Sequence, residues 1–148
     1  MPSSLKIVLS VILLFAGTFG TNAQTSDYLK HRRFFDVCSI KKQCSECHSC
    51  GQNRYIVKLQ NNDKNKNIKS ISYKFYSPVF NKIIEKDAKI TGDRIEARKI
   101  GYAYVCVLDV RHWIFSKVAY EDGSVENFTI SERLENFLQE ADECDCND

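Results

Sequence analysis

The feature that most constrains this chain is a cluster of cysteines near its N-terminus. Four of its seven cysteines lie between residues 38 and 50, and two more lie among the last five residues. A chain with this pattern is built around disulfides, or around a metal or cofactor held by thiolates. Which of these applies depends first on the redox state of the compartment that the chain reaches.

The first 23 residues have the layout of a secretory signal peptide. Lys6 precedes an apolar run over residues 7–15, and small and polar residues follow up to Ala23. The run is much shorter than the ~20 residues that a membrane span needs. We therefore expect cleavage after Ala23, secretion to the outside of the cell (or to the periplasm if the source is bacterial), and no membrane insertion after cleavage.

In such an oxidising compartment, disulfides are the default state of cysteine. Cys106 is predicted to be the unpaired thiol, because it lies in the most apolar segment, where it would behave as a small hydrophobe. The C-terminal cysteines are expected to reach back to the N-terminal cluster, in a connectivity that the sequence leaves open. The disulfide candidates are Cys38, Cys44, Cys47, Cys50, Cys144 and Cys146.

The segment CSECHSC, residues 44–50, also has a haem interpretation. Cys44, Cys47 and His48 have the spacing by which haem is attached covalently, and in these three residues the segment resembles a c-type cytochrome. The resemblance implies an electron-transfer protein with haem c linked to both thiols and His48 as an iron ligand. Against it, Met1 is the only methionine and leaves with the signal peptide, so a His/Met ligand pair is excluded.

Two further interpretations concern the same cysteines. A thiol–disulfide oxidoreductase would use Cys44 with Cys47, or Cys47 with Cys50, and would need one thiol with a lowered pKa. A zinc site is disfavoured, because Cys44, Cys47 and Cys50 crowd three ligands into seven residues, whereas structural sites pair two separated knuckles. We therefore expect no metal and no cofactor in the leading interpretation.

Periodicity predicts an α+β fold. Strands are expected at 54–60 and 69–76, paired as a hairpin, and at 101–110, 112–120 and 125–128, with a turn at Asp122-Gly123. Helices are expected at 26–37, at 77–92 with Ser77 as N-cap, and at 129–143 with a Thr129-x-x-Glu132 capping box. The prediction is a mainly antiparallel sheet of about five strands with helices packed on one face.

The expected organisation is one domain after the signal peptide of residues 1–23. Residues 24–53 would form the N-terminal helix and the Cys-rich loop, tied to the C-terminus, and residues 54–148 the α+β body. The formal net charge of +2 gives no support to nucleic acid as a partner. If the source is eukaryotic, Asn127 begins an N-glycosylation sequon.

The chain shows no Ser/His/acid pattern, no phosphate-binding loop and no paired-carboxylate motif. We therefore expect a small secreted protein that acts by binding rather than by catalysis. It would be a toxin-like or inhibitor-like effector, or an extracellular or periplasmic binding module, with a partner protein whose identity the sequence does not give. The haem protein and the oxidoreductase remain the alternatives.

Overall fold

The computed structural model describes residues 32–128, 130 and 133–139, with the side chain of Cys47 left out. The signal peptide, most of the helix predicted at 26–37, and Cys144 and Cys146 therefore lie outside the described residues. The strands are β1 (Phe35–Gln43), β2 (Asn53–Asn61), β3 (Ile68–Ser77), β4 (Lys82–Ile90), β5 (Ile100–Val107), β6 (Trp113–Tyr120), β7 (Val125–Asn127) and β8 (Leu138–Gln139). Three short 3₁₀ helices accompany them: η1 (Ser45–Cys47), η2 (Val110–His112) and η3 (Leu134–Phe137).

The eight strands form one mixed sheet in the order β7-β6-β3-β4-β5-β2-β1-β8. The pairs are antiparallel except β1 with β8, which run parallel. Strand β4 joins two halves of the sheet, of which one contains β7, β6 and β3 and the other contains β5, β2, β1 and β8. Its residues 82–88 pair with β3, and its last two residues, Lys89 and Ile90, pair with β5.

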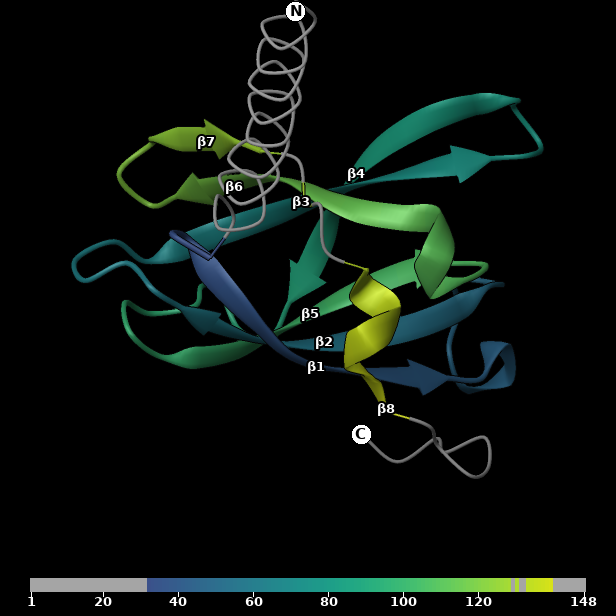
Figure 1. Ribbon diagram of the computed structural model, residues 1–148, viewed down its shortest axis with the longest axis horizontal. Helices are drawn as coiled ribbons and strands as arrows, with labels where there is room; N and C mark the ends of the chain where they lie inside the picture. The colour runs from purple at the N-terminus through teal and green to yellow at the C-terminus, as the bar shows by residue number, and fades with distance from the viewer. Residues whose placement is uncertain (1–31, 129, 131–132, 140–148) are drawn as a thin grey trace, which may run out of the picture.

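The two halves of the sheet fold over each other around one apolar core (Figure 1). Phe35 of β1 packs edge-on against Phe115 of β6 with ring centroids 5.4 Å apart, and Tyr55 of β2 lies 6.4 Å from Trp113 of β6. These contacts join strands that are far apart in the sheet order. The core is therefore the space between the two halves.

Buried and partly exposed side chains alternate along the strands, as expected for strands that cover a core with one face. In β2, Tyr55, Val57 and Leu59 are buried while the residues between them are partly exposed, as the prediction for 54–60 requires. The strands predicted at 69–76, 101–110 and 112–120 are confirmed as β3, β5 and β6, within a few residues at their ends. The turn at Asp122-Gly123 is confirmed too, with Gly123 at a φ of 85°.

The predicted α+β class is wrong, because the described residues contain no helix longer than η3 and the fold is mostly β. The predicted helix at 77–92 is a turn followed by β4, and the one at 129–143 is replaced, where it is described, by η3 and β8. The C-terminal part of the helix at 26–37 is the start of β1. In the two longer segments an apolar i, i+3, i+4 spacing belongs to extended or 3₁₀ backbone instead of an α-helical face.

The predicted hairpin between 54–60 and 69–76 is also wrong, since β2 pairs with β1 and β5, and β3 with β4 and β6. The connection between them is held by the fully buried side chain of Asn61. Its amide donates to the carbonyl oxygens of Lys66, Ile95 and Glu96 at 2.9, 3.1 and 3.1 Å. These bonds fix the loop to residues 95–96 and send β3 into the other half of the sheet. None of the described helical segments has the length and apolarity that a membrane crossing requires.

Candidate functional site: an apolar hairpin tip

The β3–β4 hairpin extends beyond the core of the fold (Figure 1). Phe75 of β3 is the last residue that pairs with β6, opposite Trp113, whereas the pairing with β4 continues to Ser77 and Lys82. The turn at residues 78–81 closes the hairpin, with Asn81 in the left-handed region at a φ of 49°. The hydroxyl of Tyr76 donates to the side-chain oxygen of Asn81 and braces this turn.

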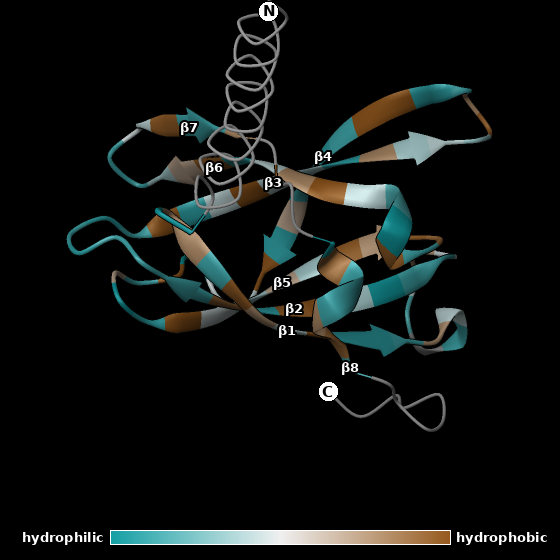
Figure 2. Cartoon of the chain, viewed as in Figure 1, coloured by the Kyte–Doolittle hydropathy of each residue, from teal (hydrophilic) through white to brown (hydrophobic). Residues whose placement is uncertain are grey.

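The end of this hairpin is apolar although it lies at the surface (Figure 2). Val79 is 84% exposed, Ile83 69%, Phe80 66% and Tyr76 48%. Leu108, 54% exposed, follows β5 beside the base of the hairpin. Five of the eight exposed large apolar side chains in the described part of the chain therefore gather at one end of the molecule. We call Tyr76, Val79, Phe80, Ile83 and Leu108 the apolar tip.

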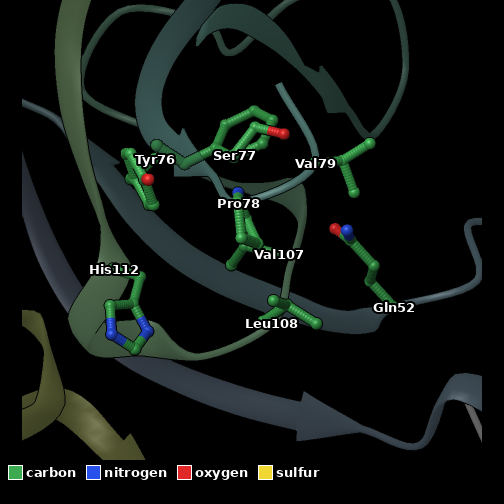
Figure 3. Close-up of a pocket in the computed structure, with 9 residues that line it drawn as sticks. Gln52, Tyr76, Ser77, Pro78, Val79, Val107, Leu108 and His112 are labelled. Carbon is green, nitrogen blue, oxygen red and sulfur yellow. The ribbon is translucent and has the colours of Figure 1, made fainter. Parts of the chain in front are cut away.

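A cavity of about 360 Å³ lies under the hairpin turn (Figure 3). Figure 3 shows Pro78 and Val107 between His112 on one side and Gln52 on the other. The lining residues are Gln52, Phe75, Tyr76, Ser77, Pro78, Val79, Val107, Leu108 and His112. A second hollow, of about 300 Å³, lies beside the paired strands β3 and β6. It is bordered by Ile83, Arg111 and Ile114. Tyr76 and His112 border both hollows, so the apolar tip is flanked by two concave surfaces.

The charges around the apolar tip are mostly basic. The ammonium group of Lys82 lies 5.8 Å from the ring centre of Phe80, and that of Lys86 lies 5.6 Å from Phe75. The carboxylate of Glu85 is engaged by Lys74 at 3.4 Å and by Lys117 at 3.2 Å. A partner surface that meets this end of the hairpin therefore faces exposed apolar side chains with lysines at their edge.

The η2 turn positions His112 and is held by two interactions. The carboxylate of Asp109 accepts a hydrogen bond from the backbone nitrogen of Arg111 at 3.0 Å. It also forms an ion pair with the guanidinium of Arg111 at 2.7 Å. These bonds lower the pKa of Asp109 from 3.8 to about 2. The hydroxyl of the buried Tyr55 accepts from the backbone nitrogen of Val110 at 3.1 Å. The imidazole of His112 makes no hydrogen bond with the described residues, and it lies close enough to Asp109 to interact with that carboxylate electrostatically.

The cysteines are arranged differently from the prediction. Cys106 is bonded to Cys50, with Cα atoms 6.2 Å apart, so it is not the free thiol. Strand β5 buries Ala103, Val105 and Val107 and turns Cys106 to the outer face, where the loop carrying Cys50 meets it.

Cys38 was predicted to form a disulfide and is instead an exposed free cysteine. It lies at the register shift of β1 between Val37 and Ser39, where a bulged residue has no cross-strand partner. Cys44 is disulfide-bonded as well, to a cysteine whose side chain lies outside the described residues. The expected link between the N-terminal cluster and the C-terminus therefore stays a prediction.

His48 lies against the Cys50–Cys106 disulfide. Its Nδ1 is 2.9 Å from the sulfur of Cys50, and its Nε2 is buried with no hydrogen-bond partner among the described residues. Burial lowers the pKa of His48 below its ordinary value of 6.5, and the positive charge of Arg54 lowers it further. The neutral imidazole is therefore favoured. His48, Cys50 and Cys106 place three potential metal-ligand atoms within 4.8 Å of one another. Because the two sulfurs are bonded to each other, only the imidazole nitrogen is available as a ligand in this state.

The haem and oxidoreductase interpretations remain predictions. Haem attachment requires the sulfurs of Cys44 and Cys47 as thiols, and Cys44 is disulfide-bonded here. The pairing of Cys50 with Cys106 likewise removes the Cys47–Cys50 pair from a redox motif. Asn127 is exposed at the end of β7, where a glycan would be accessible, although Thr129 of its sequon lies outside the described residues.

Comparison with known proteins adds no assignment: no family model, no curated protein and no solved structure matches this chain.

Sequence reasoning missed the apolar tip because Val79, Phe80 and Ile83 were counted as the buried face of a helix. The signal that points to the hairpin is the turn sequence SPVFN between two segments rich in β-branched and aromatic residues.

Proposed function

We propose that this chain is a secreted, disulfide-stabilised protein that acts by binding a partner protein through the apolar tip. The observation that carries the proposal is the grouping of four exposed large apolar side chains on a hairpin that extends past the core, with the exposed Leu108 beside its base. Exposing Val79 and Phe80 to water is unfavourable and contributes nothing to the packing of the core. Contiguous exposed apolar surface of this kind marks interaction sites in soluble proteins.

The shape of the site supports protein recognition. Binding energy at protein interfaces concentrates in a few apolar and aromatic anchors that fill pockets on the partner. Phe80 and Tyr76 supply two aromatic anchors, and the two hollows beside them accept side chains from the other surface. The turn is braced by the Tyr76–Asn81 hydrogen bond, so part of the ordering cost of binding is already met before association.

The disulfides support the extracellular half of the proposal. Cys50–Cys106 links the Cys-rich loop to β5, the strand that leads to Leu108 and the cavity floor. Such bonds persist in oxidising compartments. An inhibitor-like or toxin-like effector would act in this way, with a rigid sheet presenting an apolar hairpin to its target.

A photo-cross-linking experiment tests the proposal. A benzophenone amino acid replaces Phe80 in one variant. In the control variant it replaces Val125, a residue of β7 that is 48% exposed. Each variant is irradiated in extracellular fluid from the source, and cross-linked proteins are identified by mass spectrometry. We expect one protein to be captured from position 80 and not from position 125. Equal capture from both positions, or none from position 80, would refute the assignment of the tip as the binding surface.

A further inference from the structure

The β3–β4 hairpin has a free strand edge beside the apolar tip. Residues 82–88 of β4 pair with β3 on one side, whereas on the other side only Lys89 and Ile90 pair with β5. Residues 83–87 of β4 therefore have no neighbouring strand on their second side among the described residues. Figure 1 shows the hairpin standing out from the rest of the sheet, with β4 along its outer side. We call residues 83–87 the β4 edge.

The backbone groups of the β4 edge that point away from β3 are those of Ile83, Glu85 and Asp87. Thr91, directly after β4, donates its backbone N–H to the carbonyl oxygen of Tyr102 of β5 at 3.0 Å, which shows that its backbone points to the side of β5. In an antiparallel ladder, alternate residues direct their N–H and C=O groups to the same side. The β3–β4 pairing has no register shift, so this alternation holds along the β4 edge. The N–H and C=O groups of these three residues can therefore pair with another extended chain.

The β4 edge is long and exposed. It covers residues 83–87, and strands in globular proteins are typically about 5–6 residues long. Ile83 is 69% exposed, and Glu85, Lys86 and Asp87 are exposed as well. Proteins usually shorten, cover or charge a free edge to prevent unwanted pairing. Lysines alone would serve that purpose, whereas an exposed isoleucine beside them favours contact with an extended partner.

The acidic side chains of the β4 edge are already engaged within the hairpin and with β6. The carboxylate of Glu85 forms ion pairs with Lys74 at 3.4 Å and with Lys117 at 3.2 Å. The carboxylate of Asp87 accepts a hydrogen bond from the hydroxyl of Ser72. A strand that pairs with the β4 edge therefore meets carboxylates whose charge is offset or hydrogen-bonded inside this protein.

The lysines on the other face of β4 are not engaged by carboxylates. The ammonium groups of Lys82 and Lys86 lie over the rings of Phe80 and Phe75, at the distances given above, and neither has a carboxylate partner among the described residues. Each ammonium group has three donors, so contact with a ring face leaves donors for a carboxylate. Because residues two apart share a face of a strand, Lys82, Ile84 and Lys86 form a row of positive, apolar and positive side chains.

We propose that the partner protein of the apolar tip adds an extended segment to the β4 edge, and that this segment carries an acidic, an apolar and an acidic residue at alternate positions. The inference rests on the proposed function, because the tip and the edge belong to one hairpin. In strand addition, main-chain hydrogen bonds supply affinity and alternate side chains supply specificity. The row on β4 reads the same in both directions, so the motif holds for a parallel or an antiparallel segment. A second copy of this chain is a poorer match, because it would bring its own lysines to the same edge.

Amide hydrogen exchange of the full mature chain, measured by NMR, tests the inference residue by residue. The probe is a short synthetic peptide with glutamate, valine and glutamate at alternate positions and threonine between them. At saturating peptide, the amides of Ile83, Glu85 and Asp87 are expected to exchange at least about 10-fold more slowly than in the free protein. The amides of Ile84 and Lys86, which face β3, should not change. Two control peptides should have no effect: one with lysine in place of glutamate, and one with N-methylated backbone amides.

Variants assign the binding to the β4 edge. Glu85→Pro removes one outward N–H and keeps the N–H groups of the β3–β4 ladder, whereas Glu85→Ala loses the same carboxylate and keeps the N–H. Glu85→Pro is expected to bind the acidic peptide at least about 10-fold more weakly than Glu85→Ala. Lys82→Glu/Lys86→Glu is expected to weaken binding by at least about 10-fold, because two attractive cross-strand pairs become repulsive. Lys64→Glu/Lys69→Glu reverses two exposed charges away from the hairpin tip and should stay within about 2-fold of wild type at physiological salt.

Several outcomes would overturn the inference: equal slowing by either control peptide, equal affinity of Glu85→Pro and Glu85→Ala, or an equal loss in Lys64→Glu/Lys69→Glu. Slowing of the same amides as the concentration of the chain alone is raised would overturn it too, because the occupant would then be a second copy. If Glu85→Pro fails to fold, the comparison of the three peptides on wild type decides the question.

The proposed function and this inference fail in different ways. If a partner is captured from position 80, and Ile83, Glu85 and Asp87 exchange at unchanged rates in its complex, the inference is overturned and the apolar tip remains the binding surface. If nothing is captured from position 80 and the acidic peptide slows these amides, the proposed function alone is overturned and the β4 edge remains an acceptor for an acidic strand.

Discussion

Replacing Cys50 and Cys106 together by alanine tests whether their disulfide stabilises the fold that presents both surfaces. The two residues are separated by 56 positions in the chain, so the bond restricts a long loop in the unfolded state. In the chain-entropy description, closing a loop of this length stabilises the folded state by about 4 kcal/mol at 25 °C. Domains of this size are stable by only about 5–15 kcal/mol, so the loss is a large part of the total.

The assay is urea unfolding of the oxidised protein, followed by the fluorescence of Trp113. It is the only tryptophan, and it is 2% exposed in the core. For a slope of about 2 kcal/mol per molar urea, the double variant should unfold at a midpoint about 2 M lower than wild type. Cys38→Ala is the matched control, because Cys38 is free and exposed and its replacement should change stability by less than about 0.5 kcal/mol. A loss below about 1 kcal/mol in the double variant, or an equal loss in the control, would refute the reasoning.

Three further changes test the packing and charge arguments. Asn61→Ala leaves buried carbonyl groups without their donor and should lower the free energy of unfolding by about 3 kcal/mol in a urea titration; a loss below about 1 kcal/mol would contradict this role. Gly101→Ala would bring a Cβ to 2.5 Å from Cγ1 of Ile95, so a loss of about 1–3 kcal/mol is expected, and the same change should cost much less in an Ile95→Ala background. Asp109→Asn should lower the melting temperature above pH 4, with the difference closing as the pH falls towards 2. The pKa of Asp109 is about 2 in the folded protein against an ordinary 3.8, so the ionised carboxylate stabilises the folded state above pH 4 and this stabilisation is lost as the carboxylate is protonated. A difference in melting temperature that does not change with pH would contradict this role of Asp109.

Local pattern was enough to predict the strands whose alternation is regular. In β2, Tyr55, Val57 and Leu59 alternate with polar residues, and in the structure they face the core. The turn at Asp122-Gly123 was predictable for a related reason, since Gly123 adopts the positive φ that such turns need. These features depend on residues close together in the chain.

Pairing was not predictable in the same way, because it depends on distant residues. Asn61 looks like one polar residue in a polar loop, yet its buried amide bonds to carbonyl groups of residues 95 and 96 and separates β2 from β3. The free thiol was misassigned because apolar neighbours suggest burial, whereas β5 turns Cys106 outward and the register shift of β1 leaves Cys38 without a partner.

The site was missed for a physical reason that concerns its function. An apolar spacing of i, i+3 and i+4 is normally selected by burial against a core, and that assumption made Val79, Phe80 and Ile83 the inner face of a helix. On the hairpin the same residues are exposed, so packing of the core does not explain why they are apolar. The β4 edge is equally hidden in the sequence, because it exists only where β5 pairs with no more than the last two residues of β4.

The measurement that tests the central claim most directly is the affinity of the cross-linked partner, once purified, for wild type and for Val79→Ser/Phe80→Ser. Both side chains are exposed, so the free energy of unfolding of the variant should equal that of wild type within about 0.5 kcal/mol. Loss of two apolar anchors should weaken binding by about 100-fold or more, which corresponds to about 2.7 kcal/mol. Unchanged affinity in a variant that folds normally would contradict the account, because the apolar tip would then be exposed without serving as the binding surface.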